Sequence, residues 1–438
     1  MLIQTKQKIL LLGDILFLYL SLWLALLIRY GGIDERVLTI HLKPFSIIFI
    51  LWLIIFYIIG LYDIKNLKNS YQLIEKVVIG ILIGSTMAII IFYLVPQFEI
   101  APKTNLVLFS GVYLILVTGW RLLFNYTTAK PLSRALIIGQ GKEIEELINF
   151  FGQHPQLGYH LCQHWSEEQA ASKNISELVK LDKINTIIVP KTFGQRDELF
   201  KKIYATLILG VEVIDITTAY ENILRKVPLS EIQQIWLLTN LTKSHRIYEV
   251  IKRPLEFLIS LALLVLLSPL IVLIWLLVRI TSHGPGFYRQ IRISKNEQQF
   301  TMYKFRTMIN DAEISGYQWS PKQDPRVTPL GKILRTTHID ELPQLINIIK
   351  GNLSFVGPRP ERPEFIDQLK KEIPYYDTRH LVKPGLTGWA QINYRYASSI
   401  KDAYEKLQYD IFYLKNRSIT LDVLILIKTI NSFFNNPV

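Results

Sequence analysis

The sequence predicts a membrane protein with three parts: an α-helical bundle, an α/β middle domain, and a mixed α/β C-terminal domain that carries one more apolar helix. Half of the 438 residues are hydrophobic and the mean hydropathy is positive, so the chain is too apolar to be wholly soluble. Apolar runs gather near the N-terminus, and short strands alternate with helices from residue 133. We place the domains at residues 1–130, 131–245 and 246–438.

The net charge of +13 and the single cysteine narrow the class of protein further. The sequence contains no recognised nucleic-acid module, so we expect no nucleic-acid partner. Membrane lipids with anionic headgroups, a phosphate-bearing lipid and a nucleotide substrate account for the basic excess. Cys162 alone excludes an intramolecular disulfide and a cysteine-based metal cluster, which fits a reducing compartment.

Four apolar runs precede the middle domain, at residues 9–28, 45–61, 73–95 and 105–124. Each is near the roughly 20 residues that a bilayer requires. No small-residue cleavage site follows the first run, so we interpret it as an uncleaved span. Lysines and arginines gather between the second and third runs and after the fourth, which places both ends of the bundle in the cytoplasm. Arg29, Arg36 and Lys43, in the first outer loop, weaken this signal.

Asp14 is the acidic residue inside the first run. Two interpretations are open: a functional acid within the membrane, or an interface position one or two turns from Lys6 and Lys8. The second is favoured.

The middle domain shows a strand and helix alternation. Residues 135–138, 186–189 and 211–216 predict buried strands of a parallel, doubly wound sheet, with a tight turn at 139–141 and a helix at 143–151. The turn Gly139-Gln140-Gly141 invites a dinucleotide interpretation, but Ile144 stands where the third glycine of that fingerprint belongs. A structural turn is favoured.

The apolar run at 257–278 is long enough to cross a bilayer, but Ser268-Pro269 lies at its centre. Proline removes a helix hydrogen bond, and the serine hydroxyl can satisfy part of what is freed. Basic residues flank both ends of the run, including Lys252 and Arg253 before it and Arg279 after it. Both ends therefore belong on one side of the membrane, so we predict a re-entrant helix at 255–280.

Two adjacent carboxylates, Asp340 and Glu341, begin a predicted helix in which Pro343 fits the first turn and Gly351 marks the end. Neighbours on a helix point roughly 100° apart, so the pair cannot act face to face as in glycosidases. The two carboxylates therefore have different roles. The structural alternative is that Asp340 is a helix N-cap and Glu341 a first-turn acid.

Basic residues surround these carboxylates in the sequence. Phosphoryl transfer needs this composition: a nucleophilic carboxylate, an acid that holds a divalent ion, and cations for phosphate oxygens. Lys304 and Arg306 lie two apart and would share one face of a strand, which suits a diphosphate, or else a solvated pair. The candidate substrate-binding residues are Arg335, Lys304, Arg306, Arg359, Arg379, Lys383 and Arg395.

Four motifs at 304–308, 334–344, 356–360 and 383–391 resemble, in order and spacing, the bacterial sugar transferases, which are monotopic polyprenyl-phosphate phosphoglycosyl transferases. The resemblance covers roughly residues 251–438. It implies transfer of a sugar phosphate from a UDP-sugar to polyprenyl phosphate, through a phosphosugar-aspartate intermediate and with Mg²⁺, as the first membrane step of exopolysaccharide or related glycan synthesis. By position it makes Asp340 the nucleophile, Glu341 the metal ligand and Arg335 a neighbour of the lipid phosphate.

The same resemblance implies a catalytic domain on the cytoplasmic face of the bacterial inner membrane, a hairpin broken at Ser268-Pro269, and a Rossmann-like middle domain. A homodimer is expected. Trp389 or Tyr394 could stack on uracil, or could pack in the core. The apolar-rich stretch at 419–434 is interrupted by polar residues and predicts a helix in the interface plane.

Two rival functions remain. An NAD-dependent nucleotide-sugar oxidoreductase would use a Tyr-x-x-x-Lys motif, which occurs at Tyr126 to Lys130 and Tyr248 to Lys252, although neither position suits a base beside a nicotinamide. A non-catalytic polysaccharide-assembly factor would need the acidic pair only as a helix cap.

Overall fold

The computed structural model describes residues 2–32, 34–63, 69–95, 103–128, 133–190, 197–232, 234–241, 245–309, 324–394 and 399–435. The chain divides into two compact units, Met1–Ile223 and Leu224–Val438. Val227, Ile232 and Trp236 pack in a hydrophobic core with residues of the C-terminal helices. This stretch, which the sequence prediction assigns to the middle domain, therefore belongs to the second unit.

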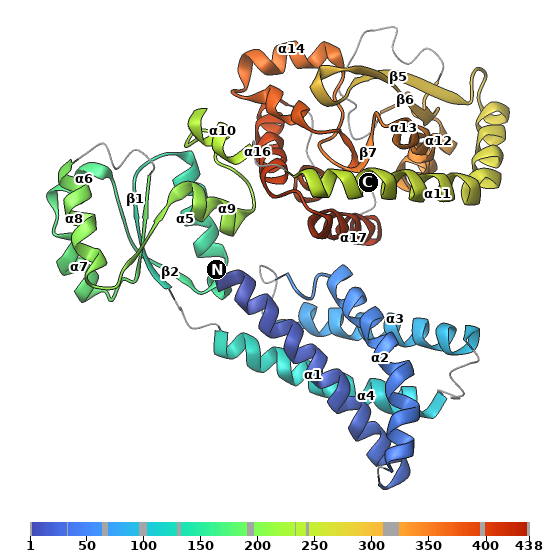
Figure 1. The fold of residues 1–438 in the computed structure, drawn as a ribbon, viewed down its shortest axis with the longest axis horizontal. Helices are drawn as coiled ribbons and strands as arrows, with labels where there is room; N and C mark the ends of the chain where they lie inside the picture. The colour runs from blue at the N-terminus through green and yellow to red at the C-terminus, as the bar shows by residue number, and fades with distance from the viewer. Residues whose placement is uncertain are drawn as a thin grey trace. The chain divides into compact units, whose positions relative to one another are not determined.

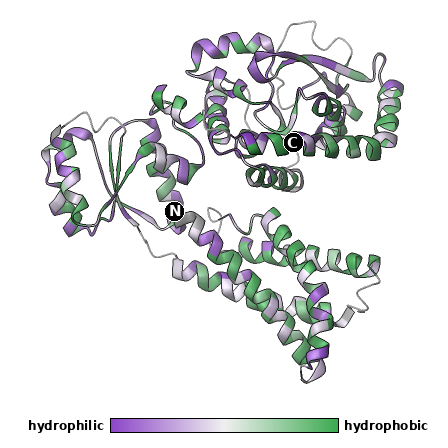
Figure 2. Ribbon diagram, in the orientation of Figure 1, coloured by the Kyte–Doolittle hydropathy of each residue, from purple (hydrophilic) through white to green (hydrophobic). Residues whose placement is uncertain are grey.

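The first unit begins with four long helices, α1 (Leu2–Tyr30), α2 (Glu35–Ile58), α3 (Tyr71–Leu94) and α4 (Lys103–Thr128) (Figure 1). They confirm the four predicted apolar segments as helices, and each is long and apolar enough to cross a membrane. Hydrophobic residues, coloured green, predominate along all four helices in Figure 2. Stacked and edge-on rings of Phe45, Trp52, Phe109 and Tyr113 fill the interior of the bundle.

Asp14 lies inside this bundle and forms an ion pair with Arg121 of α4. Both side chains are almost completely buried. Arg121 also donates to the carbonyl oxygen of Leu61, 2.7 Å away, just after α2. The acidic charge in the first apolar helix is therefore compensated by a partner on another helix, as a charge in an apolar environment requires.

The first unit also contains an α/β domain. Strands β1 (Ser133–Ile138), β2 (Tyr159–Trp165), β3 (Thr186–Val189) and β4 (Glu212–Asp215) form a parallel sheet in the order β2-β1-β3-β4. The helices between them are α5 (Lys142–Gln153), α6 (Glu167–Ser172), α7 (Ile175–Leu181) and α8 (Asp197–Leu207), and α9 (Ile216–Leu224) follows β4. The three predicted strands are confirmed. The edge strand β2 was missed because polar residues such as His160 and Gln163 interrupt any apolar pattern.

The tight turn at Gly139–Gly141 is confirmed, since both glycines have positive φ. Ile144 of α5 packs against Gly139: a Cβ on that glycine would lie 2.7 Å from the Ile144 Cδ1 atom. The isoleucine at the third-glycine position thus fills the space beside the turn, which favours the structural interpretation of this motif.

The second unit combines two small sheets with helices (Figure 1). A hairpin of β5 (Phe287–Ile293) and β6 (Gln299–Phe305) is antiparallel, and β7 (Ser354–Val356) pairs in parallel with β8 (Gly385–Thr387). The helical elements are α10 (Gln234–Leu241), α11 (Arg246–Thr281), α12 (Pro329–Thr336), η6 (Ile339–Gln344), α13 (Leu345–Lys350), α14 (Pro363–Glu372), η7 (Tyr376–Leu381), α15 (Trp389–Asn393), α16 (Ile400–Asn416) and α17 (Ile419–Asn435). The predicted helix at 419–434 corresponds to α17.

Helix α11 is continuous over 36 residues and contains Pro269, and Figure 1 shows that its axis changes direction along its length. Pro269 cannot donate to the carbonyl oxygen of Val265, and the Ser268 hydroxyl donates to that oxygen instead, at 2.8 Å. This confirms the predicted role of the serine hydroxyl. Leu264, before the proline, packs against one hydrophobic cluster of the second unit. Ile274, after it, is part of another.

Most other apolar side chains of α11 are exposed in the chain by itself. The helix is long and apolar enough to cross a membrane, and only 11% of its most apolar stretch is buried. Figure 2 shows hydrophobic residues along the length of α11. A helix with an open apolar surface on both sides of a bend is suited to contact with lipid.

Candidate active site

The acidic pair lies in a short 3-10 turn, η6, that joins α12 to α13. Thr328 caps α12, since its hydroxyl accepts a hydrogen bond from the Gly331 N–H at 3.0 Å. Gly331 is required because a Cβ there would lie 2.1 Å from the Thr307 carbonyl oxygen. His338 then adopts φ +53°, and Gly351 ends α13 at φ +85°, as predicted. The acidic pair is therefore presented by a turn that is fixed at both ends.

Asp340 is buried, with 7% of its surface exposed. It is not the N-cap, since His338 has that position. Within the described part of the chain, its carboxylate makes no hydrogen bond. Burial raises the pKa of Asp340, and Glu341 raises it further, whereas Lys304, His338 and Arg335 oppose the shift. A carboxylate that is unpaired among the described residues and lies among cations is a candidate nucleophile.

Glu341 has a different environment from its neighbour. Its Oε1 atom accepts a hydrogen bond from Lys304 Nζ at 2.6 Å and lies 3.7 Å from Arg359 Nη2. Burial alone would raise the pKa of Glu341, but the charges of Lys304 and Arg359 outweigh burial and lower this pKa to about 2. The two carboxylates thus differ in environment.

Lys304 and Arg306 do not share one environment. Arg306 is buried, and its Nη1 and Nη2 atoms donate to the carbonyl oxygens of His283 at 2.9 Å and Ser282 at 2.6 Å. These contacts fix the residues that follow α11. Lys304 and Arg306 were predicted to contact one diphosphate together. Two guanidinium nitrogens of Arg306 donate to the main chain instead, so of this pair only Lys304 remains for that predicted contact.

Arg335 lies near the acidic turn, at the end of α12. Its Nε atom donates to Thr307 Oγ1 at 2.9 Å, and its positive charge is among those that lower the pKa of Asp340. The contact holds Arg335 beside the segment that follows β6.

The other predicted cations are distributed differently. Arg359 is 45% exposed and faces Glu341, whereas Arg379 is buried and pairs with Asp410 at 3.0 Å. Lys383 is half-buried, and burial, together with nearby Arg253, lowers its pKa. Arg395 lies outside the described residues. The structure therefore brings Lys304, Arg335 and Arg359 close to the acidic turn.

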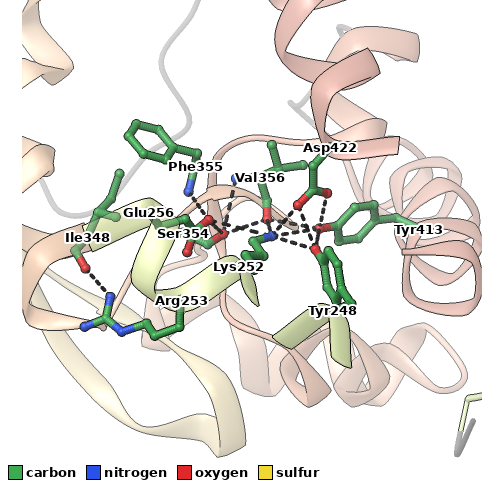
Figure 3. A network of polar contacts seen from close by, with 10 residues as sticks. All are labelled: Tyr248, Lys252, Arg253, Glu256, Ile348, Ser354, Phe355, Val356, Tyr413 and Asp422. Atoms are coloured by element: carbon green, nitrogen blue, oxygen red, sulfur yellow. Dashed lines mark hydrogen bonds and ion pairs between the residues drawn. The ribbon is translucent and has the colours of Figure 1, made fainter. Parts of the chain in front are cut away.

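Arg253 connects α11 to α13, the helix that follows the acidic turn. Its Nη1 atom donates to the carbonyl oxygen of Ile348 at 2.6 Å (Figure 3). Its Nη2 atom donates to the carbonyl oxygen of Ile349 at 2.9 Å, also near the end of α13. A guanidinium at these carbonyls complements the negative end of the helix. The end of α13 is therefore held by a residue near the start of the apolar helix α11.

Sequence reasoning missed a second network, which surrounds Lys252 (Figure 3). Its ammonium donates to Tyr248 OH at 2.8 Å and to the Val356 carbonyl oxygen at 2.9 Å, and pairs with Asp422 at 2.8 Å. Tyr413 donates to Asp422 Oδ1 at 2.9 Å. The network joins α11, β7, α16 and α17.

The four-residue spacing of Tyr248 and Lys252 was a visible signal, because it puts both side chains on one helix face. These contacts give the pair a structural role in place of the one that an oxidoreductase would need. The Trp389 side chain is likewise used in the core: it is buried, stacks on Phe412, and donates to the Arg225 carbonyl oxygen at 2.8 Å.

The sequence of this chain is similar to known proteins. The bacterial sugar transferase family matches residues 247–436. The exopolysaccharide production protein PSS of Rhizobium leguminosarum bv. phaseoli is 37% identical over 189 residues, which cover 42% of this chain and 94% of that protein. This chain belongs to the bacterial sugar transferase family.

Two further relatives match over more residues, and their names state a reaction. The UDP-N-acetylgalactosamine-undecaprenyl-phosphate N-acetylgalactosaminephosphotransferase of Aeromonas hydrophila is 35% identical over 282 residues, 64% of this chain and 65% of that protein. The UDP-glucose:undecaprenyl-phosphate glucose-1-phosphate transferase of Klebsiella pneumoniae is 39% identical over 192 residues, 43% of this chain and 41% of that protein. In both cases the match spans less than two thirds of the relative's length.

Proposed function

We propose that this sugar transferase moves a sugar 1-phosphate from a UDP-sugar to a polyprenyl phosphate such as undecaprenyl phosphate and releases UMP. The reaction would be the first membrane step in the synthesis of an exopolysaccharide or related glycan. The names of the Aeromonas and Klebsiella relatives support the reaction class and its lipid acceptor. These two names differ in the sugar, so the proposal leaves the sugar open.

One observation carries the proposal: Asp340 is buried without a hydrogen-bonding partner among the described residues, next to a Glu341 that Lys304 and Arg359 already neutralise. A structural acid would be expected to cap a helix or to pair with a cation. Among the described residues Asp340 does neither, which supports a chemical role.

The proposed reaction has two displacements at phosphorus. A carboxylate oxygen of Asp340 attacks the β-phosphorus of the UDP-sugar, the bond from that phosphorus to the UMP oxygen breaks, and UMP leaves. A phosphate oxygen of the polyprenyl phosphate then attacks the same phosphorus, and the bond to Asp340 breaks. The carboxylate is regenerated, and the sugar phosphate is now on the lipid. Lys304, Arg335 and Arg359 would stabilise negative charge on the phosphate oxygens.

We propose that Mg²⁺ assists this reaction through Glu341. Among the described residues, no group of three or more His, Cys, Asp or Glu side chains could hold a metal ion. Mg²⁺ is commonly bound by one or two carboxylates together with substrate phosphates, so a single glutamate fits that pattern. Both contacts of Glu341 with cations use Oε1. When bound, Mg²⁺ would offset charge on the diphosphate.

We further propose that α11 enters one leaflet of the bacterial inner membrane and returns, so that the catalytic unit remains on the cytoplasmic face. The bend, the proline and the packing of each arm against a hydrophobic cluster of the same unit support this topology. The nucleophile would then lie at the boundary between a water-soluble donor and a lipid acceptor. We also propose that the protein forms a homodimer. The α/β domain would have a Rossmann-like fold and would act as a regulatory or dimer-forming module.

The test is UMP release by the purified protein from UDP-glucose and from UDP-N-acetylgalactosamine, with and without undecaprenyl phosphate. The variant is Asp340→Asn, and the matched control is Asp367→Asn, an exposed acid of α14. We expect UMP from the native protein and the control, and none from Asp340→Asn.

Other results would contradict parts of the proposal. Release of UMP by Asp340→Asn at the native rate would exclude the covalent route. Absence of UMP with every donor in a UDP-sugar panel would favour the assembly-factor alternative, and reduction of NAD by the native protein would favour the oxidoreductase.

A further inference from the structure

Each carbonyl oxygen of the segment from Pro358 to Glu361 accepts a hydrogen bond, although the segment has no regular secondary structure. The carbonyl oxygen of Pro358 accepts a hydrogen bond from the Gly385 N–H at 2.9 Å, and that of Glu361 from the Ile293 N–H at 3.1 Å. Between them, the Arg359 carbonyl oxygen accepts from Arg379 Nη2 at 3.1 Å, and the Pro360 carbonyl oxygen from Arg292 Nη1 at 3.0 Å. Donors from β8, η7 and β5 thus hold four consecutive carbonyls.

The two guanidinium groups that hold this segment are themselves held. Arg379 pairs with Asp410 of α16 at 3.0 Å and donates to Tyr376 OH at 2.6 Å. Both members of the ion pair are more than nine-tenths buried. Arg292 donates from Nε at 2.9 Å and from Nη2 at 2.6 Å to Gln290 Oε1.

The Arg359 side chain contrasts with its main chain. It is 45% exposed, and its one ion-pair contact among the described residues is the 3.7 Å approach to Glu341. A fixed backbone with an open guanidinium is the arrangement that positions a charge for a substrate phosphate without using it for folding.

We propose that Arg379, Asp410 and Arg292 are positioning residues that fix the Pro358–Glu361 segment and thereby hold the Arg359 guanidinium opposite Glu341. This inference rests on the proposed transferase reaction and deepens it. It gives Arg379 a role different from the predicted substrate contact, because the contacts of Arg379 are with Asp410, Tyr376, Glu361 and the Arg359 carbonyl.

The test is a double-mutant cycle on kcat/KM for UMP release. Arg379→Lys and Arg292→Lys keep the positive charge but lose the planar fork that reaches the carbonyl. In the native background we expect each to lower kcat/KM by roughly 10- to 100-fold, since a displacement of about 1 Å can cost that much. In an Arg359→Ala background we expect neither to lower it further, because both act through Arg359.

Asp410→Asn and Asp410→Glu complete the test. The asparagine removes the charge that pairs with Arg379, whereas the glutamate keeps it, so partial recovery of kcat/KM is expected only with glutamate. The matched control is Arg417→Lys: Arg417 also donates to a carbonyl oxygen, that of Leu414 at 2.7 Å, and lies 3.4 Å from a carboxylate oxygen of Glu249. We expect it to leave kcat/KM unchanged.

The outcomes separate the alternatives. Losses that persist at full size in the Arg359→Ala background would overturn the inference and favour direct contact of Arg379 with substrate. If Arg379→Lys does not fold, Arg292→Lys decides by the same criterion, because it acts on a different carbonyl from a different strand. A native protein that releases no UMP contradicts the proposed function, whereas an active protein with additive losses contradicts only the positioning role.

Discussion

Replacement of Lys304 by methionine should destabilise the second unit at neutral pH. Lys304 is the closest cation to Glu341, with Nζ 2.6 Å from Oε1, and both side chains are largely buried. Methionine keeps most of the aliphatic length and removes the charge and the hydrogen bond. Glu341 would then keep only Arg359, 3.7 Å away and 45% exposed, as an ion-pair partner among the described residues.

The magnitude follows from the pKa of Glu341, which the protein lowers from 4.5 to about 2. One pKa unit corresponds to about 1.4 kcal/mol, so the lowered pKa represents about 3 kcal/mol of stability when the carboxylate is ionised in both states. Because the folded-state pKa is depressed, this stability is present above about pH 4.5 and is lost as the pH falls toward 2. Lys304→Met should remove most of it.

The assay is thermal unfolding in detergent, in steps from pH 7 to pH 3. A loss of about 3 kcal/mol should lower Tm by roughly 6 to 12 °C for a unit of this size, and the deficit should shrink as the pH falls below 4.5. The matched control is Lys370→Met, whose partner Glu297 is half exposed, so its Tm should change by an amount that corresponds to less than about 1 kcal/mol. Equal Tm values for Lys304→Met and the native protein at pH 7 would refute the reasoning.

Three further predictions concern other parts of the chain. Arg121→Leu leaves Asp14 buried without its ion-pair partner and should cost about 3–5 kcal/mol by thermal unfolding, unlike exposed Arg36→Leu; an equal effect of both would contradict the importance of the pair. In a Cys162→Ser background, single cysteines at Arg246 and His283 should both react with an impermeant thiol reagent added to the cytoplasmic side, whereas protection of one would indicate a crossing helix. Because burial raises the pKa of Asp340, its ionisation opposes folding as the pH rises through that pKa, so Asp340→Asn should have a Tm at pH 7 at least equal to the native value; a large decrease would show that the carboxylate is needed for folding.

Local chemistry allowed much of this fold to be predicted. The Ser268 hydroxyl reaches the carbonyl oxygen that Pro269 cannot, and Gly351 ends α13, because both effects act within one helical turn. The apolar helices and three of the four parallel strands also follow from periodicity and composition.

Contacts between distant residues were not predictable in the same way. Arg306, Arg359 and Arg379 looked equivalent as cations near a phosphate site. Which of them remains open depends on where main-chain carbonyls from other segments lie, such as those of Ser282 and Arg359. Asp422 joins Lys252 across 170 positions of sequence, and no local pattern indicates that pair.

The covalent bond between Asp340 and the sugar phosphate is the central claim of the proposed reaction. The measurement is intact-protein and peptide mass spectrometry after incubation with a UDP-sugar in the absence of polyprenyl phosphate. We predict an added mass of one sugar phosphate on the peptide that contains Asp340, its loss when polyprenyl phosphate is supplied, and no adduct in Asp340→Asn. An active native protein that releases UMP only when both substrates are present, with no adduct on any peptide, would contradict the claim.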